Sequence, residues 1–311
     1  MKKDFTSIQS ILFIVFVLLV VFGSTMPYWS SSKEDSLTEF STNRALELVK
    51  EISKKPHYIG SENHEKVAQF LLKELQDLGL KPTIQEGFTL TDWGNLVKSK
   101  NIIARIKGTD NSKALLLLSH YDSAPHSNSY GASDDASGVA TILEGVRAFL
   151  HSKKAPKNDI IILFTDAEEL GLNGAALFVT KHSWAKEIGL VVNFEARGTS
   201  GTSFMFMETT NGNSKMVEGF KTAKPSFPAT NSLYYSIYKM LPNDTDLTVF
   251  REQGKIQGFN FAFIDSHYNY HTQQDDYNHL DENSLRHQGS YLMPLLHYFS
   301  NSDLSNLKTT E

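Results

Sequence analysis

The 311-residue chain contains no cysteine and no excess of positive charge. Without cysteine, the chain has no disulfide scaffold, no thiolate zinc site and no cysteine nucleophile. Any metal ion must therefore be bound by His, Asp and Glu side chains. The 30 Lys and Arg residues against 35 Asp and Glu residues give a net charge of −5, which argues against a nucleic-acid binder.

The remaining composition is that of a folded protein. Hydrophobic residues make up 40% of the chain and aromatic residues 11%, which is enough for a sizeable core and excludes wholesale disorder. A length of 311 residues suits one large α/β domain or two small domains.

The N-terminus contains a long uncharged stretch. No charged residue occurs between Asp4 and Lys33, and Ile11–Phe22 is unbroken apolar sequence. About 20 apolar residues are enough to cross the hydrocarbon core of a bilayer. The sequence therefore predicts one N-terminal transmembrane helix within a signal anchor over residues 1–32. A cleaved signal peptide is the alternative, because its apolar core is about as short as this one.

The charges beside this stretch predict its orientation. Lys2 and Lys3 precede the apolar run, and positive residues favour the cytoplasmic side of a membrane. We therefore expect a cytoplasmic N-terminus and a single-pass topology. Residues 33–311 would then form one domain outside the cytoplasm, in a periplasmic, extracellular or lumenal compartment.

Apolar strands alternate with helices through the middle of the chain. Strands are expected at Ala114–Leu118, Asp159–Phe164 and Leu190–Phe194, and helices at Ala136–His151 and Asn173–Lys181. Further strands are expected at Thr83–Leu90, Asn101–Lys107 and Phe259–Ile264, and further helices near residues 45–52, 62–78, 232–240 and 282–299. This alternation predicts an α/β fold with a mixed, largely parallel sheet sandwiched by helices.

Polar residues gather where the expected strands end, which is where α/β sheets bind their ligands. They are His120, Asp122, Asp134, Asp135, Glu168, Glu169, Glu195 and His271. Each residue alone is explained as a helix cap, a solvated charge or a structural histidine. Together, several carboxylates at one sheet edge would repel one another, and a divalent cation relieves that repulsion. The pattern therefore favours a metal site.

Five motifs in the same order resemble a known family. They are His120-Tyr-Asp122-Ser, Gly131-Ala-Ser-Asp134-Asp135-Ala-Ser-Gly, Glu168-Glu169-Leu-Gly, Asn193-Phe-Glu195 and Tyr270-His271-Thr. This set resembles the co-catalytic dizinc aminopeptidases of metallopeptidase family twenty-eight. Within that family, it is similar to the membrane-bound branch of the endoplasmic reticulum metallopeptidase and the vacuolar membrane protease.

The resemblance implies a site for two zinc ions, with other divalent metals possible. Asp134 would bridge the two ions. His120 and Glu195 would complete one site, and Glu169 and His271 would complete the other. These nitrogen and oxygen donors are ones that zinc accepts.

The resemblance also implies roles for three residues around the ions. Glu168 would be the general base for the attacking water. Asp122 would accept a hydrogen bond from the His120 ring, and Asp135 would help to hold the bridging carboxylate. One position departs from the soluble members of the family, which have aspartate where this chain has Glu195.

The expected function is that of a membrane-anchored zinc metallopeptidase. It is expected to be an aminopeptidase that acts on peptides with a free N-terminus. A single-zinc glutaminyl-cyclase-like transferase, an inactive peptidase-like binding ectodomain, and a carboxypeptidase or deacylase are the alternatives. The sequence leaves side-chain preference, oligomeric state, native metal, and dipeptidase or endopeptidase action open.

Overall fold

The computed structural model describes residues 2–25, 36–91, 94–110, 113–240 and 244–310. The chain divides into two compact units, residues 1–31 and residues 32–311, each of which is described by itself. The expected boundary between residues 32 and 33 lies outside the described residues, so it stays a prediction.

The first unit contains the helix α1, Lys2–Thr25. Its apolar side chains, among them Phe13, Phe16 and Leu19, are exposed. Within the described residues, however, no helix has the combination of length and apolar character that a bilayer span requires. The expected transmembrane helix is therefore not supported by the structure. The later part of the uncharged stretch, residues 26–32, lies outside the described residues.

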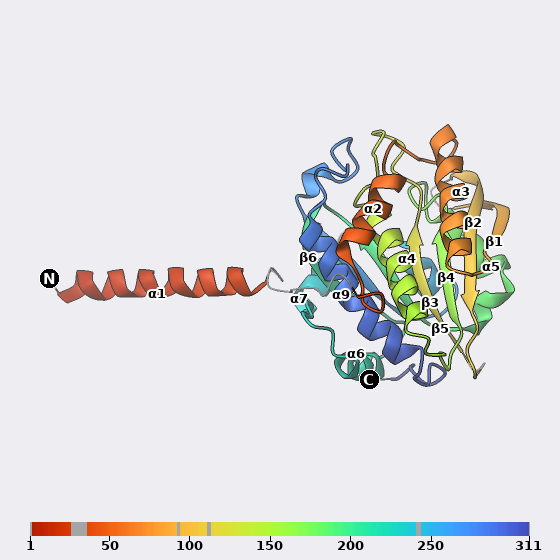
Figure 1. Cartoon of the computed structure of the whole chain (residues 1–311). Coiled ribbons are helices and arrows are strands. Elements are labelled where there is room, and N and C mark those ends of the chain that lie inside the picture. Colours follow the sequence, from red (N-terminus) through yellow and green to blue (C-terminus); the bar gives the residue numbers. More distant parts are fainter. Residues whose placement is uncertain (1, 26–35, 92–93, 111–112, 241–243, 311) are drawn as a thin grey trace. The chain divides into compact units, whose positions relative to one another are not determined.

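The second unit is built on a seven-stranded mixed sheet (Figure 1). Its spatial order is β1-β2-β4-β3-β5-β7-β6. The strands are β1 (Thr83–Leu90), β2 (Leu96–Ile106), β3 (Ala114–His120), β4 (Ile160–Thr165), β5 (Ile188–Ala196), β6 (Ser200–Glu208) and β7 (Gly258–Asp265). The four central strands β4, β3, β5 and β7 run parallel, whereas β1, β2 and β6 pair antiparallel at the two edges.

One face of the sheet is covered by the larger group of helices. They are α2 (Thr42–Ile52), α3 (Glu62–Asp77), α4 (Ala136–His151), α6 (Ser214–Ala223) and α9 (Glu282–Phe299). Figure 1 shows α4 and α9 crossing this face side by side, and the two helices are in contact. The approach is close at Gly145 of α4, where a Cβ atom would lie 2.1 Å from Leu292 of α9.

The opposite face is covered by α5 (Asn173–Lys181) and α8 (Asp246–Glu252), which contact each other. The helix α7 (Ser232–Met240) follows α6 and has no fully buried side chain. Two short 3₁₀ helices, η1 (Ser183–Glu187) and η2 (His267–Asn269), precede β5 and follow β7. Helices on both faces explain why every residue of β3 and β4 is buried.

The mixed α/β sheet and most of its elements agree with the sequence prediction. The strand β6 and the helices α6 and α8 were not expected. In α6, Gly219 weakens the helical pattern, but its missing side chain lets the Phe299 ring approach to 2.8 Å from the position of a Cβ atom. In β6, the polar start Ser200-Gly-Thr-Ser hides the strand, whose later residues such as Met205 are buried.

The buried side chains of the central strands contribute to the stability of this unit. Leu117 of β3 is completely buried, so we expect Leu117→Ala to lower the free energy of unfolding by about 2–5 kcal/mol. The same substitution at Leu96, whose side chain is 68% exposed, is expected to change it by less than about 0.5 kcal/mol. Chemical denaturation measures both values, and equal losses would contradict this account of the core.

Candidate metal centre

The adjacent strands β3 and β5 carry the first pair of site residues, His120 and Glu195. In the parallel register, Leu118 of β3 pairs with Asn193 of β5, and His120 and Glu195 each lie two residues further along. Because side chains alternate along a strand, both project from the same face of the sheet at the strands' carboxyl ends. His120 Nε2 and Glu195 Oε2 are 3.8 Å apart, and both side chains are almost fully buried.

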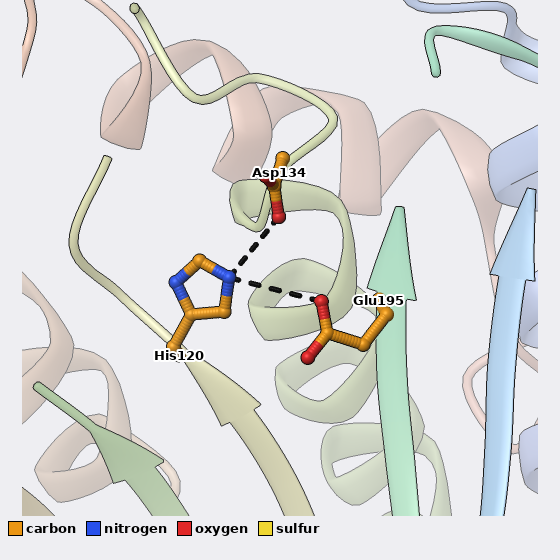
Figure 2. Close-up of side chains that lie close together, drawn as sticks. All are labelled: His120, Asp134 and Glu195. Carbon is orange, nitrogen blue, oxygen red and sulfur yellow. Dashed lines mark hydrogen bonds and ion pairs between the residues drawn. The ribbon is translucent and has the colours of Figure 1, made fainter. Parts of the chain in front are cut away.

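Asp134 joins this pair from the loop that precedes α4. Its Oδ1 lies 3.1 Å from His120 Nε2, and Figure 2 shows His120, Asp134 and Glu195 pointing toward one another. The other oxygen of the same carboxylate, Oδ2, lies 3.1 Å from His271 Nε2. One carboxylate thus faces two histidines with its two oxygens.

His271 and Glu169 complete a second cluster around Asp134. His271 Nε2 lies 2.9 Å from Glu169 Oε2. Glu169 follows β4 in a turn before α5, rather than at a helix start, and His271 lies in the loop after η2. The possible ligand atoms of each triad lie within 4.8 Å of one another. The structure therefore brings together all five residues that the sequence singled out as metal ligands.

The donor geometry fits divalent cations. Donors about 2.1 Å from a tetrahedral zinc ion are about 3.4 Å from each other. The four separations between a histidine nitrogen and a carboxylate oxygen in the two triads, from 2.9 to 3.8 Å, lie around that value. In addition, Glu169 Oε1 is buried without a hydrogen-bond partner among the described residues. A cation would satisfy this oxygen.

The pKa values of these residues are shifted by burial and by the neighbouring charges. Burial, with a further contribution from Asp134, raises the pKa of Glu169 to about 7 and that of Glu195 to about 8. Burial opposes the charged form of His271, but hydrogen bonds to Asp134 and Glu169 raise its pKa to about 10. Burial likewise opposes ionisation of Asp134, but hydrogen bonds from His120 and His271 outweigh it and lower its pKa.

Asp122 positions the residues around the ligands. The Nδ1 atom of His120 lies 3.0 Å from the backbone carbonyl of Asp122 and 3.5 Å from its carboxylate Oδ1. The closer acceptor is therefore the backbone, not the carboxylate that the sequence suggested. The carboxylate instead accepts hydrogen bonds from the backbone N–H groups of Glu168 (3.1 Å) and Glu169 (3.3 Å).

Asp135 and Asp275 hold the loop that carries Asp134. Asp135 caps α4 by accepting from Gly138 N and also accepts from the Ser119 hydroxyl. The peptide bond between Asp134 and Asp135 is cis. The carboxylate of Asp275 accepts from the backbone N–H groups of Ser133 (2.7 Å) and Asp134 (3.1 Å).

Sequence reasoning missed Asp275. Its side chain is completely buried, and burial, with the nearby Asp134 charge, raises its pKa to about 7. No signal distinguishes Asp275 from the adjacent Asp276 in the polar sequence Gln-Gln-Asp-Asp. Only the tertiary contact between its loop and the loop of Asp134 reveals its position.

Glu168 lies at the same rim as the ligands. Burial raises its pKa well above the ordinary value, and the neighbouring Glu195 and Glu169 carboxylates add to this effect against the opposing influence of His120. Asp246, at the start of α8, also contributes to the negative charge around Glu168 and is itself completely buried against the Thr165 hydroxyl. A carboxyl group with a raised pKa beside a metal site is suited to accept and return a proton.

A pocket opens directly beside this cluster. It has a volume of about 520 Å³ and includes Glu195, Arg197 and Tyr270 in its wall. Most of the other lining residues are apolar or aromatic and come from β6, α7 and β7: Phe204, Phe206, Tyr234, Ile237, Tyr238, Ala262 and Ile264. Four polar residues complete the lining: Thr245, Asn260, Asp265 and His267. A larger hollow of about 1000 Å³, between β6 and α6, is lined by none of the candidate ligands.

An α/β sheet with two His and carboxylate triads at its carboxyl edge places the chain among proteins with a candidate metal centre on this kind of sheet. A family model described as Peptidase family M28 matches residues 101–296, which include all five candidate ligands. The chain belongs to this family of peptidases. The resemblance seen in the ordered motifs is thereby confirmed.

Named relatives are similar over most of the second unit. A vacuolar membrane protease from Candida tropicalis is 33% identical over 270 residues, covering 83% of this chain and 29% of the relative. Endoplasmic reticulum metallopeptidase 1 from Rattus norvegicus is 32% identical over 207 residues, covering 66% of this chain and 23% of the relative. The chain thus spans about a third or less of the length of these relatives.

Solved structures share the fold at low sequence identity. A zinc aminopeptidase from Bacillus subtilis has a TM-score of 0.69 at 16% identity, covering 89% of this chain and all of that structure. A glutaminyl cyclase from Porphyromonas gingivalis has a TM-score of 0.64 at 22% identity, covering 83% of this chain and 98% of that structure. These likenesses establish the fold and leave the reaction to be argued from the site.

The pKa values predict how metal affinity depends on pH. A metal ion binds deprotonated donors, so it must displace the protons that Glu169, Glu195 and His271 hold below pKa values of about 7, 8 and 10. Lowering the pH from 8 to 6 adds protons to both carboxylates and keeps His271 charged. We expect zinc affinity to fall by about tenfold or more across this range.

Competition with a chromophoric chelator at pH 6, 7 and 8 measures this change. Calorimetry in two buffers with different ionisation enthalpies reports the protons released on binding. Zinc affinity that is independent of pH, with no proton release, would contradict the assignment of these residues as ligands.

Proposed function

We propose that the protein is a dinuclear zinc-dependent aminopeptidase that removes N-terminal residues from peptides. One observation carries the dinuclear assignment. The two oxygens of Asp134 face His120 and His271 at 3.1 Å each, so one carboxylate is shared by two triads. A carboxylate whose two oxygens face two separate donor sets can bind two neighbouring metal ions at once.

The proposed ligands are His120, Asp134 and Glu195 for one ion, and Asp134, Glu169 and His271 for the other. When bound, a pair of zinc ions supplies Lewis acidity, which lowers the pKa of water and polarises a carbonyl group. Zinc accepts both nitrogen and oxygen donors, although other divalent metals bind similar sets.

Glu168 is the proposed general base. The hydrogen bond from its backbone N–H to Asp122 fixes the start of the turn in which it lies. Its carboxylate, at the same rim as the ligands, takes a proton from the attacking water and returns it to the leaving amine. The same Asp122 carboxylate holds the backbone N–H groups of both glutamates, and only Glu169 belongs to a candidate triad, which leaves the Glu168 side chain for proton transfer.

A substrate with a free N-terminus is proposed from the resemblance to the aminopeptidases. The neutral amine of such a substrate offers a nitrogen donor of the kind that zinc accepts, whereas an acetylated N-terminus does not.

The glutaminyl cyclase alternative rests on the shared fold. The resemblance assigns those enzymes one zinc ion and fewer than five ligands, whereas this chain retains both His120 and Glu195. A peptidase-like binding domain without activity is disfavoured by Glu168, because a non-catalytic site has no need for a base at this position. The number of bound metal ions distinguishes these possibilities.

Membrane association is part of the proposal. The relatives described above carry the words vacuolar membrane and endoplasmic reticulum in their names. In this chain, α1 exposes Phe13, Phe16 and Leu19, and an apolar helical surface of this kind favours contact with lipid. We propose that the peptidase unit acts close to a membrane surface.

The product of the reaction tests the proposal directly. We expect the purified zinc-loaded chain to release single N-terminal residues from free peptides and to leave N-acetylated peptides intact. Glu168→Gln is expected to lower kcat by about 10²–10⁴-fold, because proton transfer is lost, while the zinc content stays unchanged. Mass spectrometry of the products and elemental analysis of the same samples measure both effects.

The same experiment separates the alternatives. Conversion of N-terminal glutamine to a cyclic product with loss of ammonia would favour the cyclase. Cleavage of the acetylated peptides would contradict the aminopeptidase assignment. Wild-type turnover by Glu168→Gln would remove Glu168 from the mechanism.

The pocket beside Glu195 predicts a preference for large apolar side chains at the substrate N-terminus. Its apolar walls and volume of about 520 Å³ accommodate an aromatic or long aliphatic side chain. We expect Ile237→Asp, which places a charge in this wall, to reduce kcat/KM for N-terminal Leu or Phe by about tenfold or more, with a smaller effect on N-terminal Ala.

Leu233 provides the matched control. It lies on the same helix α7 with 66% of its side chain exposed, and it is absent from the pocket lining. Leu233→Asp is therefore expected to leave the ratio of kcat/KM values for Leu and Ala peptides unchanged. Equal effects of the two substitutions would show that the pocket does not bind the N-terminal side chain of the substrate.

A further inference from the structure

The five candidate ligands are not supported equally. His120 and Glu195 extend from strands, whereas His271 lies in a loop with a backbone φ of +53°. The side chain of His271 is 40% exposed, compared with 1% for His120. A ligand on an exposed loop needs other contacts to fix the direction of its ring.

The two imidazoles also differ at the ring nitrogen that faces away from Asp134. His120 Nδ1 lies 3.0 Å from the Asp122 carbonyl, a hydrogen bond that sets the ring orientation. Within the described part of the chain, His271 has hydrogen-bond or ion-pair contacts only through Nε2, to Asp134 and Glu169. The orientation of His271 must therefore come from contacts of the ring face.

Tyr270 supplies that contact. The rings of Tyr270 and His271 are stacked, with centroids 3.7 Å apart and an interplanar angle of 20°. The guanidinium group of Arg197 lies 5.6 Å from the centroid of the Tyr270 ring. A cation at this distance from an aromatic ring is attracted to the ring's π electrons.

Arg197 is itself held in place from several directions. It follows Glu195 by two residues at the end of β5, and its backbone N–H donates to the Phe263 carbonyl of β7 at 2.9 Å. Its Nη2 donates to the Asp244 carbonyl at 2.7 Å. Its guanidinium is a cation, because arginine stays protonated in proteins.

We propose that Arg197 and Tyr270 are positioning residues that orient His271 for the second metal ion. Arg197 transmits the rigidity of the strand that carries Glu195 to the loop that carries His271, with the Tyr270 ring between them. This inference rests on the proposed dinuclear function. It assigns to these two side chains a selective effect on the triad of Asp134, Glu169 and His271.

Metal binding to the full chain tests the inference without relying on activity. Zinc is titrated into metal-free protein against a competing chelator, and bound zinc per chain is counted by elemental analysis. We expect Arg197→Met and Tyr270→Ala to weaken binding of one of the two ions by about 10–100-fold, the effect typical of losing a group that orients a ligand. Binding of the other ion is expected to stay at the parent value.

Conservative variants separate positioning from packing. Tyr270→Phe keeps the stacked ring, and Arg197→Lys keeps a cation, so both are expected to retain the second ion better than Tyr270→Ala and Arg197→Met. The double variant Arg197→Met/Tyr270→Ala should lose little more than either single variant, because both act on His271 through one path. Tyr268→Ala is the matched control, since Tyr268 is 70% exposed and lies in η2, directly before the loop of Tyr270 and His271.

The outcomes distinguish this inference from the proposed function. Two ions bound with parental affinity by both Arg197→Met and Tyr270→Ala would overturn the positioning role and leave the dinuclear site intact. Fewer than two ions in the parent chain would overturn the proposed function itself. If Arg197→Met does not fold, the comparison of Tyr270→Ala with Tyr270→Phe decides the question, because Tyr270 lies in a partly exposed loop.

Discussion

Repulsion between buried carboxylates is the constraint on which this site depends. Asp134, Glu169 and Glu195 converge with Glu168 at one edge of the sheet, and burial raises the pKa values of the three glutamates. Two imidazoles offset only part of this charge. Such an arrangement is unfavourable as a purely structural feature, and bound cations convert it into a favourable one.

The fold opposes this repulsion by fixing each donor through a different element. The parallel pair β3 and β5 holds His120 and Glu195 in register. Asp134 lies in a loop whose backbone is bound by the Asp275 carboxylate and whose next residue caps α4. The carboxyl ends of parallel strands thus give a rigid frame on one side of Asp134, and loops complete the other side. This division explains why the support for His271 differs from the support for His120.

The sequence predicted the parts of this structure that depend on local pattern. Continuous apolar strands such as β3 and β4, alternating with helices, predict a sheet with both faces covered. The polar residues at the strand ends predict a metal site in general, and the resemblance in the ordered motifs selects five of them as expected ligands. Residues that act through tertiary contacts could not be found in this way. Asp275 looks like any acidic loop residue, and the Asp122 carboxylate binds two backbone N–H groups that no spacing rule connects to it.

A fold that enzymes of different activity share does not by itself determine the reaction. Aminopeptidases and glutaminyl cyclases have this architecture in common, so the strands cannot decide the reaction. The reaction depends on the side chains at one edge of the sheet. These are the metal donors around Asp134 and the residues that line the adjacent pocket. In this chain both features meet at the end of β5, where Glu195 belongs to one candidate triad and Arg197 lines the pocket. Under the proposed function, a single strand end would couple the metal site to substrate recognition.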